Sequence, residues 1–506
     1  MNKKILFWID LFTLNFGLAY YLQKQFEYDF FAIIDTTNKP KSFFQTQRLV
    51  KFKKSWFYHD QINKNHQHPD VKFLTSFEKK YNINLWQLAI NDRLFYRFND
   101  FHKFSRDEIL SILEQECKFY ENVLDEINPD LIIMQQPPLR HSFLFYKLCN
   151  SRGIRIIMTN QSVIGYKCFL SQNPNKLDLI DQLSNIQTSN RSFEYLQQYK
   201  KSLNYSQQVT DYVTSFADSK IDKLKAAIDF LLFSDNKNIN TNYLYYGRTK
   251  LRVLLHEINI SLKRKYRKSF IDKNLTKKID SDEPFVYFPL QVEPERNLLI
   301  GAPTFTNQIE SIRTVAKSLP MGFKLFVKEH PAQNRTWRKI STYKEIMNIP
   351  NVLLIHPDVP SEKLYKNCSL VITIIGTSPF EAAFYGKPSI VFGDVVYSSL
   401  PSVFRVNNFD ELQKIIQKSL QCKVNASDLD KFITFLDQNS FDFDFFGYYT
   451  KQAKIFFYGS NLANVKLSES KMKSFLDENE SLFDVIVNEH VKKIKEIIHV
   501  VSKNLK

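Results

Sequence analysis

A short segment with phosphate-binding potential follows a predicted buried strand. Gly376, Thr377, Ser378 and Pro379 stand in a row, and Glu381 follows. Glycine lets a ligand approach the backbone, serine is a preferred helix N-cap, and proline suits the first helical position. We therefore predict a helix with Ser378 as N-cap, whose free N–H groups and neighbouring hydroxyls bind a phosphate. Glu381 has two interpretations: it completes a capping box with Ser378, or it accepts hydrogen bonds from a ribose.

A second candidate lies at the end of the predicted strand 324–327. Lys328 and His330 are two residues apart, so they share a face of an extended chain, and Pro331 keeps the residue before it extended. We predict that the two side chains form a compact cationic or hydrogen-bonding pair for phosphate or carboxylate. The other nine histidines are interpreted as surface or core residues.

A third candidate follows the predicted strand 285–290. Gln291, Glu295 and Arg296 lie just past this strand. Polar residues at the carboxyl edge of a parallel sheet line the usual ligand crevice. The alternative is a proline-rich turn with a surface Glu–Arg pair.

The apolar pattern predicts the elements that position these residues. Short apolar runs alternate with helical patterns in both halves of the chain, which is typical of doubly wound parallel sheets. Strands are expected at 4–9, 30–34, 131–134, 154–158, 285–290, 324–327, 352–355, 370–375, 389–392 and 403–406. Helices are expected at 107–127, 141–150, 308–319, 361–366, 379–385 and 410–420, with one or two amphipathic helices in the last forty residues.

Composition restricts the class of protein. The chain has 506 residues, a net charge of +16 and only 11 glycines, which disfavours disordered and glycine-rich architectures. Its five scattered cysteines have no metal-ligand spacing, so we expect reduced thiols in a cytoplasmic protein. The apolar run 5–22 resembles a signal anchor, but Asp10 interrupts it, and we expect a buried strand followed by a helix.

The positive charge is concentrated in residues 248–278. This stretch has eleven Lys and Arg against two acids, a local charge of 11 − 2 = +9. One interpretation is the solvated face of a connector, and the other is attraction to anionic phospholipid headgroups or a lipid-diphosphate acceptor. No recognised nucleic-acid module is present, so no nucleic-acid partner is expected.

These patterns predict an α/β protein with two doubly wound, Rossmann-like domains that face a central cleft. The predicted segments are an N-terminal α/β domain (1–247), a basic connector (248–282), a C-terminal Rossmann-like domain (283–460) and a helical extension (461–506). Ligands are expected where the carboxyl ends of both sheets converge.

Residues 283–407 resemble the capsule polysaccharide biosynthesis proteins, which include Kdo transferases. The resemblance is carried by Tyr287-Phe-Pro-Leu-Gln291-x-x-Pro-Glu295-Arg296, Val327-Lys-Glu-His-Pro331, Gly376-Thr377-x-x-x-Glu381-Ala, Gly386-Lys-Pro388, Val391-Phe-Gly-Asp394 and Val403-Phe-Arg-Val406. It implies a GT-B glycosyltransferase with the acceptor mainly on the first domain and the nucleotide sugar on the second. It also implies that Lys328, His330, Gly376, Thr377 and Glu381 bind the nucleotide phosphate and ribose. Some members of the family use CMP-Kdo.

The resemblance is weakest at the catalytic group. Acid–base or nucleophilic work on a sugar needs a carboxylate, and Asp10, at the end of the first predicted strand, is the candidate. The alternative is an aspartate that caps a turn. Asp442 and Asp444 have the spacing of a metal-binding pair, but GT-B enzymes generally need no such motif, so neither a metal nor another cofactor is predicted.

Three functions are compatible with these features. The first is a cytoplasmic glycosyltransferase, peripheral to the inner membrane, that moves a sugar such as Kdo from a nucleotide sugar to a surface or capsular polysaccharide or its lipid-linked primer. The second is a polyol-phosphate transferase that uses CDP-glycerol. The third is a non-catalytic protein that binds glycans or organises their assembly.

Overall fold

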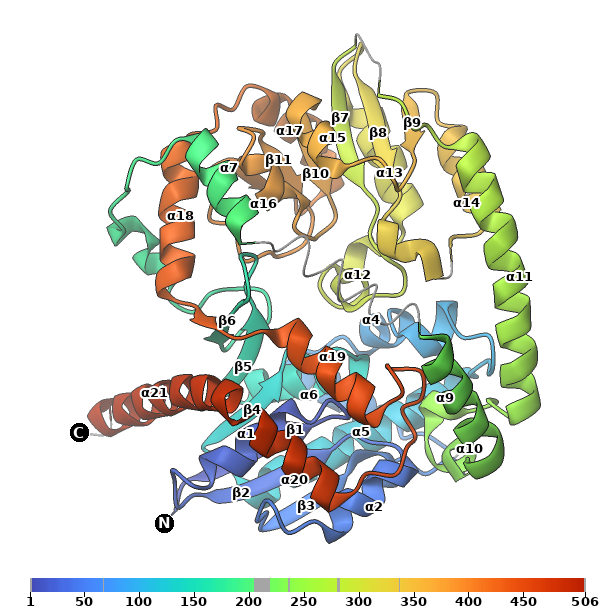
Figure 1. Ribbon diagram of the computed structural model, residues 1–506, viewed down its shortest axis with the longest axis vertical. Helices are drawn as coiled ribbons and strands as arrows, with labels where there is room; N and C mark the ends of the chain where they lie inside the picture. The colour runs from blue at the N-terminus through green and yellow to red at the C-terminus, as the bar shows by residue number, and fades with distance from the viewer. Residues whose placement is uncertain are drawn as a thin grey trace. The chain divides into compact units, whose positions relative to one another are not determined.

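The computed structural model describes residues 2–66, 68–203, 219–234, 237–279, 283–335 and 337–504. The chain forms two compact units. Unit 1 contains Met1–Pro174, Asn204–Arg252 and Asn439–Lys506, and unit 2 contains Asn175–Leu203 and Val253–Gln438 (Figure 1). Each unit is built on its own sheet, as predicted for two Rossmann-like domains.

The sheet of unit 1 has seven strands in the order β13-β6-β5-β4-β1-β2-β3. The five strands from β5 to β3 are parallel, while β6 runs antiparallel to β5 and β13 antiparallel to β6. Strands β2 and β3 lie on one side of β1, and β4, β5 and β6 lie on the other side. The topological switch point is therefore between β1 and β4. The strands are β1 (Lys4–Ile9), β2 (Asp29–Ile34), β3 (Lys54–Phe57), β4 (Leu131–Gln135), β5 (Ile156–Gln161), β6 (Lys167–Ser171) and β13 (Phe441–Asp442).

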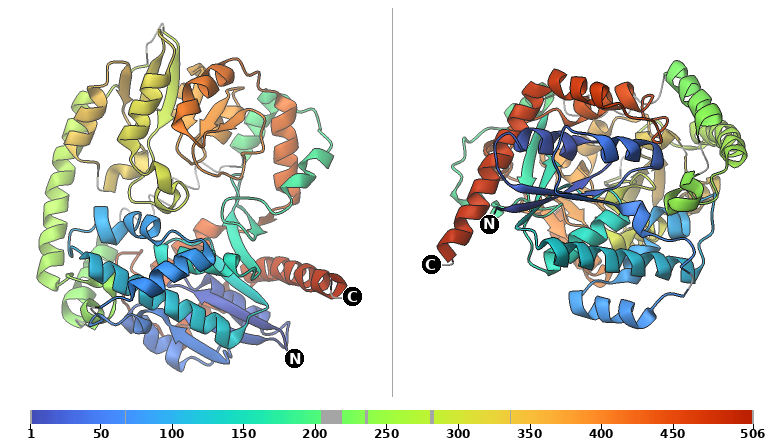
Figure 2. Two further views of the ribbon diagram at one scale, coloured as in Figure 1. Left: turned by 180° about the vertical axis from the view of Figure 1, so that it is seen from behind. Right: turned by 90° about the horizontal axis from the view of Figure 1, so that it is seen from below.

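Both faces of this sheet are covered by helices (Figure 2). Alternating residues of β1 enter two cores: Leu6 and Trp8 pack on one side, and Ile5, Phe7 and Ile9 on the other. The helices of unit 1 are α1 (Leu14–Leu22), α2 (Asn38–Thr46), α3 (Val71–Tyr81), α4 (Leu85–Ile90), α5 (Arg106–Ile127), α6 (Arg140–Ser151), α9 (Lys220–Phe233), α10 (Lys237–Thr241), α19 (Phe445–Phe456), α20 (Glu469–Glu478) and α21 (Glu480–Asn504).

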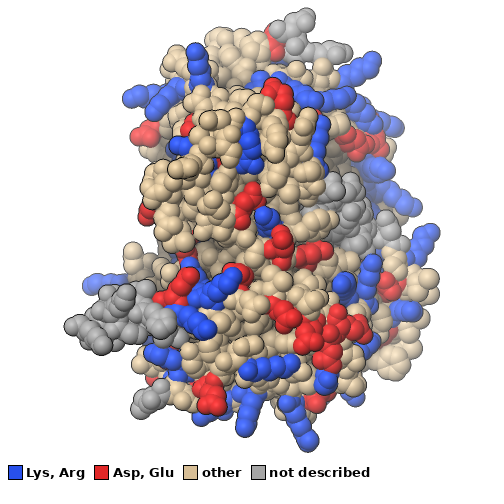
Figure 3. All heavy atoms as spheres, turned by 60° about the vertical axis from the view of Figure 1, so that its left-hand side comes forward, with Lys and Arg blue, Asp and Glu red and all other residues tan. Residues whose placement is uncertain are grey.

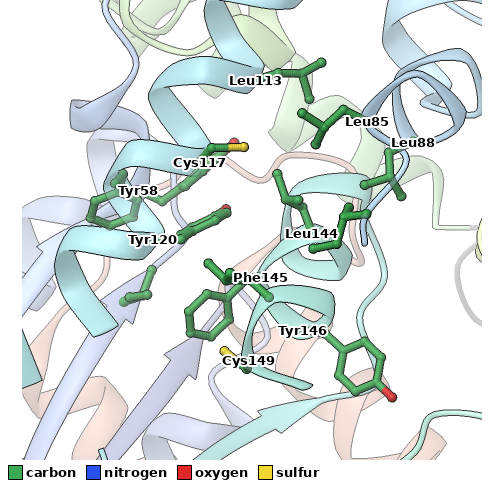
Figure 4. Packing of buried hydrophobic residues seen from close by; sticks show 14 of the residues in the cluster. Tyr58, Leu85, Leu88, Leu113, Cys117, Tyr120, Leu144, Phe145, Tyr146 and Cys149 are labelled. Carbon is green, nitrogen blue, oxygen red and sulfur yellow. The ribbon is translucent and has the colours of Figure 1, made fainter. Parts of the chain in front are cut away.

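The first core is formed mainly by α5 and α6 (Figure 4). Helix α5 starts with a capping box, in which Ser105 and Glu108 each bond the other's backbone N–H. Its apolar positions then face the sheet, where Tyr120 and Phe145 are packed with their ring centroids 5.1 Å apart.

The second core includes the C-terminal helices. Phe483 of α21 stacks on Tyr21 of α1 with centroids 5.1 Å apart, and the Tyr21 hydroxyl donates to the Leu476 carbonyl at 2.9 Å. The amphipathic helices expected in the last forty residues are therefore present, and they pack on unit 1. The described helices include none that is long and apolar enough to cross a membrane.

The boundaries of the units differ from the predicted segments. Residues 439–460 were expected in the second domain but belong to unit 1, because β13 pairs with the edge strand β6 and α19 enters the second core. Residues 175–203 were expected in the first domain but belong to unit 2. The basic connector contains one helix, α11 (Lys250–Asn274), which lies mainly in unit 2.

Unit 2 has a six-stranded parallel sheet in the order β12-β11-β10-β7-β8-β9. Its topological switch point is between β7 and β10. The strands are β7 (Phe285–Pro289), β8 (Lys324–Lys328), β9 (Val352–Ile355), β10 (Leu370–Thr373), β11 (Ser389–Val391) and β12 (Val403–Arg405). Besides α11, the helices are α7 (Phe193–Ser202), α12 (Arg296–Leu299), α13 (Gln308–Ser318), α14 (Ile340–Met347), α15 (Ser361–Asn367), α16 (Ser378–Ala383), α17 (Leu412–Leu420) and α18 (Ala426–Gln438).

Candidate functional site

The turns after β7 and β10 meet at the switch point of unit 2. Gln291 follows β7, and its Nε2 donates to Thr373 Oγ1 at the end of β10, at 3.0 Å. Gly376 has a φ of +117°, and a Cβ on this residue would lie 3.2 Å from Gln291 Oε1. The sequence therefore needs glycine here both for the backbone conformation and for the close approach of Gln291.

A buried ionic cluster fixes the turn after β8 to the turn after β7. Arg338 pairs with Glu329 Oε2 at 2.9 Å and with Glu293 Oε1 at 3.0 Å, and it also donates to the Gln291 carbonyl. The Tyr343 hydroxyl donates to Glu329 Oε2 at 2.7 Å. The three turns around residues 291, 330 and 376 therefore gather at one edge of this sheet.

Lys328 is a buried cation at this edge. Its Nζ donates to the Ser361 hydroxyl at 3.0 Å, at the start of α15. Burial lowers the pKa of Lys328 to about 8, although the charges of Glu381, Asp358 and Glu329 oppose the shift. The attraction of these carboxylates is therefore smaller than the cost of burying the ammonium, and an anionic ligand would stabilise the charged form.

His330 is neutral at pH 7. Crowding by protein atoms and the positive charges of Lys328 and Arg338 lower the pKa of His330 to about 4. Its Nδ1 accepts a hydrogen bond from the Ala332 N–H at 3.1 Å, so the proton of the neutral ring is on Nε2. Of the two predicted alternatives for this pair, the structure favours a hydrogen-bonding role for His330 beside the cation of Lys328.

The helix after Gly376 starts one residue earlier than predicted. Ser378 is the first residue of the helix, and Thr377 occupies the N-cap position. The backbone of Thr377 is already close to helical (φ −94°, ψ −10°) after the turn at Gly376. The predicted Ser378–Glu381 capping box is therefore not formed. Helix α16 has only six residues, so its dipole is small.

Glu381 is bonded through both carboxylate oxygens. Thr377 Oγ1 donates to Oε1 at 3.3 Å, and Lys200 Nζ contacts Oε2 at 3.2 Å. Lys200 lies on α7, which is fixed to this part of unit 2 because Gln197 Nε2 donates to the Phe384 carbonyl at 2.9 Å. No sequence motif marks Lys200, since it lies in a stretch without a recognisable chemical pattern.

Glu295 and Arg296 lie on the short helix after β7. Glu295 is exposed at the N-cap position of α12 and makes no side-chain cap. Arg296 donates to Asn297 Oδ1 at 3.2 Å and to Asn175 Oδ1 at 3.4 Å. Glu293, which was not a predicted site residue, is the carboxylate of this segment that joins the Arg338 cluster.

Asp10 is a buried carboxyl group at the switch point of unit 1. It follows β1, and its Oδ1 accepts a hydrogen bond from the Phe12 N–H at 3.1 Å. Burial and the nearby charge of Asp35 raise the pKa of Asp10 to about 7. Such a group can take up or release a proton near neutral pH. The Phe12 bond is also the local turn contact that the alternative interpretation expects.

Asp35, at the end of the neighbouring strand β2, is held by two histidines. His141 Nε2 lies 2.7 Å from Asp35 Oδ2, and His59 Nε2 lies 3.1 Å from Oδ1. Burial alone would raise the pKa of Asp35, but the two histidines hold it well below its usual range. Asp35 therefore remains ionised beside Asp10.

A second buried ion pair supports His141. Arg140 donates to both oxygens of Glu116, and the Tyr243 hydroxyl lies 3.2 Å from His141 Nδ1 and 3.1 Å from Arg140 Nη2. The sequence interpretation missed His59 and His141. The available signal was topology, because His141 follows β4, the strand next to β1.

The Asp442–Asp444 pair has a local structural role. Asp444 Oδ1 accepts a hydrogen bond from the Gly447 N–H at 2.8 Å and caps α19. Asp442 lies in β13, which pairs with β6. This spacing is explained by a strand that passes directly into a capped helix.

Comparisons with known proteins agree with the sequence motifs. The capsule polysaccharide biosynthesis protein family matches residues 186–436, which confirms the predicted resemblance. This match starts just before α7 and includes all the predicted site residues of unit 2. No curated protein matches the chain at a significant level.

Two of the solved structures that the chain matches are the following. The Methanocaldococcus jannaschii UDP-GlcNAc 2-epimerase is 14% identical, with 87% of this chain and 99% of that chain covered and a TM-score of 0.24. The Thermosulfurimonas dismutans KpsC, a beta Kdo 2,7 transferase, is 13% identical, with 72% and 87% covered and a TM-score of 0.28.

Proposed function

Because residues 186–436 match the capsule polysaccharide biosynthesis protein family, we propose that this protein is a metal-independent glycosyltransferase of the GT-B type. Its donor is a nucleotide sugar, with CMP-linked Kdo or a related acidic sugar as the first candidate. Its acceptor is a surface or capsular polysaccharide, or the lipid-linked primer of one.

The burial of the Lys328 ammonium is the observation that carries this proposal. The buried Lys328 ammonium donates to a hydroxyl, and burial lowers its pKa to about 8 even though the charges of three carboxylates act to raise it. The phosphate of a nucleotide sugar would supply a further counterion at the carboxyl edge of a doubly wound sheet, where such ligands bind.

The neighbouring residues suit the rest of the donor. Gly376 has no side chain that would block a phosphate, although Gln291 lies against it in the structure, and neutral His330 can donate from Nε2. Lys200 contacts one carboxylate oxygen of Glu381 in the structure. If Lys200 moves to the phosphate, this oxygen can accept a hydrogen bond from a ribose hydroxyl. Gln291, Thr377 and Ser378 add polar groups, and Glu295 and Arg296 remain candidates for contacts with the nucleotide.

Asp10 is the proposed acid–base or nucleophilic group. A buried carboxyl group with a pKa of about 7 suits proton exchange with a sugar hydroxyl at neutral pH. Asp35 and its histidines are positioning residues, because the negative charge of Asp35 helps to keep the pKa of Asp10 high.

A thermal-shift screen with CMP-, UDP-, GDP- and CDP-activated donors tests the donor assignment. A ligand at about 100 times its Kd stabilises the protein by about 2.7 kcal/mol, which such a screen detects. We expect stabilisation by a nucleotide sugar, its loss in Lys328→Met and Lys200→Met, and its retention in Lys317→Met, which changes an exposed lysine of α13. A preference for CDP-glycerol would instead identify a polyol-phosphate transferase.

Transfer assays separate an enzyme from a non-catalytic assembly protein. With the donor found in the screen, Asp10→Asn should bind the donor as the wild type does and lose sugar transfer. Undiminished transfer by this variant would remove Asp10 from the mechanism.

A further inference from the structure

An exposed apolar stripe runs along α11 in unit 2. Leu254, Ile258, Leu262 and Tyr266 are four residues apart in turn, so they lie on one face of the helix, and Leu255 widens this face. Ile258, Leu262 and Tyr266 are 60%, 64% and 71% exposed. We refer to these five residues as the α11 stripe.

The opposite face of α11 packs on its own unit. Ile271 is 1% exposed and lies nine residues (271 − 262) from Leu262, about two and a half turns at 3.6 residues per turn. Arg267, on the same side of the helix as Ile271, donates to the Trp337 carbonyl at 2.8 Å. Phe270 lies one turn beyond Tyr266 on the face of the stripe and stacks on Tyr343 of α14 with centroids 6.4 Å apart, so the stripe ends at Tyr266. Figure 1 shows one end of α11 beside α14. The stripe is therefore the outward face of a helix that is already anchored.

Basic residues surround the stripe. The segment 263–268 reads Lys-Arg-Lys-Tyr-Arg-Lys, and Lys263, Arg264, Lys265 and Lys268 are exposed. The acids of α11 are Glu257 and Asp272, and Asp272 lies 3.1 Å from His356. By contrast, basic and acidic side chains are intermixed on the face drawn in Figure 3.

We propose that the α11 stripe inserts into the surface of a bilayer that contains anionic phospholipid. An apolar face flanked by Lys and Arg is the pattern of a helix that lies in the membrane interface, where the apolar side chains enter the acyl boundary and the ammonium groups reach the headgroup phosphates. The sequence predicts only the electrostatic part of this attachment. The exposed stripe adds a hydrophobic part, and the basic charge selects an anionic membrane rather than a second copy of this strongly basic helix.

Vesicle co-sedimentation of the full chain tests this proposal. The probes are vesicles of phosphatidylcholine alone and of equal parts phosphatidylcholine and phosphatidylglycerol. The wild type should bind the second kind preferentially. Ile258→Glu/Leu262→Glu should lower the partition coefficient at least about tenfold, because both side chains enter the acyl boundary. Lys265→Gln/Lys268→Gln should lower it about fivefold per removed charge and weaken its dependence on salt.

The matched control is Met321→Glu, which makes the same kind of change at a 99% exposed apolar residue outside α11. It should bind vesicles as the wild type does. Circular dichroism verifies that the α11 variants retain their helix content. Equal binding by the wild type and Ile258→Glu/Leu262→Glu would overturn the proposal. So would a dimer in analytical ultracentrifugation that this double variant dissociates while the wild type ignores vesicles, because the stripe would then pair with a second copy.

Discussion

Replacement of Asp10 by asparagine should stabilise unit 1 in a pH-dependent way. The pKa of Asp10 rises from 3.8 to about 7 on folding, so the folded state binds this proton more tightly than the unfolded state. The stability contributed by the protonated group is complete below pH 4 and is lost as pH rises through 7. At 1.36 kcal/mol per pKa unit, the ionised carboxylate costs the folded state about 4 kcal/mol above pH 7.

The difference between Asp10→Asn and the wild type should therefore grow with pH. At pH 5 the carboxyl group is protonated in the folded state and costs about 1.5 kcal/mol, whereas at pH 8 it costs the full amount. We expect the free energy of unfolding of Asp10→Asn to gain about 2–3 kcal/mol on the wild type between these two pH values. Asp10→Asn should lack sugar transfer throughout this pH range.

The assay is urea unfolding read by pulsed hydrogen exchange and mass spectrometry. Peptides from β1 and β2 report on unit 1 separately from unit 2, which matters because two units need not unfold together. Asp100→Asn, at an exposed aspartate of unit 1, controls for the removal of one negative charge. A difference between Asp10→Asn and the wild type that does not change with pH would refute the assignment of a raised pKa to Asp10.

Three further predictions concern unit 2. Arg338→Met should lower its free energy of unfolding by about 3–5 kcal/mol in urea titrations, because Glu329 would stay buried without its ion pair; a loss below 1 kcal/mol would contradict this. Gly376→Ala should cost about 1–2 kcal/mol, since alanine resists a φ of +117°, and calorimetry should show a lower Tm. Donor affinity in isothermal titration should fall as pH rises from 7 to 9, because Lys328 loses its proton with a pKa of about 8, whereas Lys328→Met should bind weakly at both values.

The strands could be predicted closely because their signals are local. The apolar run 352–355 coincides with β9, and the run 4–9 with β1. The ends of parallel strands then follow from the chain order, which is why the turns at 291, 330 and 376 could be assigned to one edge of the sheet. The confirmed features are thus the two Rossmann-like sheets and the clustering of these turns within unit 2. The central cleft between the domains and the catalytic role of Asp10 stay predictions.

The missed residues depend on contacts between distant parts of the chain. Lys200 reaches Glu381 across 181 residues, and His141 reaches Asp35 across 106. No local pattern marks either partner. The start of α16 was misplaced for a local reason, because the positive φ of Gly376 already directs Thr377 into the helix.

The chain leaves unit 1 after Pro174, returns at Asn204, and returns again at Asn439. An expression fragment that stops near residue 438 would lack β13, which pairs with β6, and also Phe483 and its neighbours, which seal one face of the sheet. No single cut of the chain therefore gives a fragment that contains all of unit 1 and none of unit 2. During synthesis, unit 1 can complete its fold only after β13 and the helices that follow it have been made.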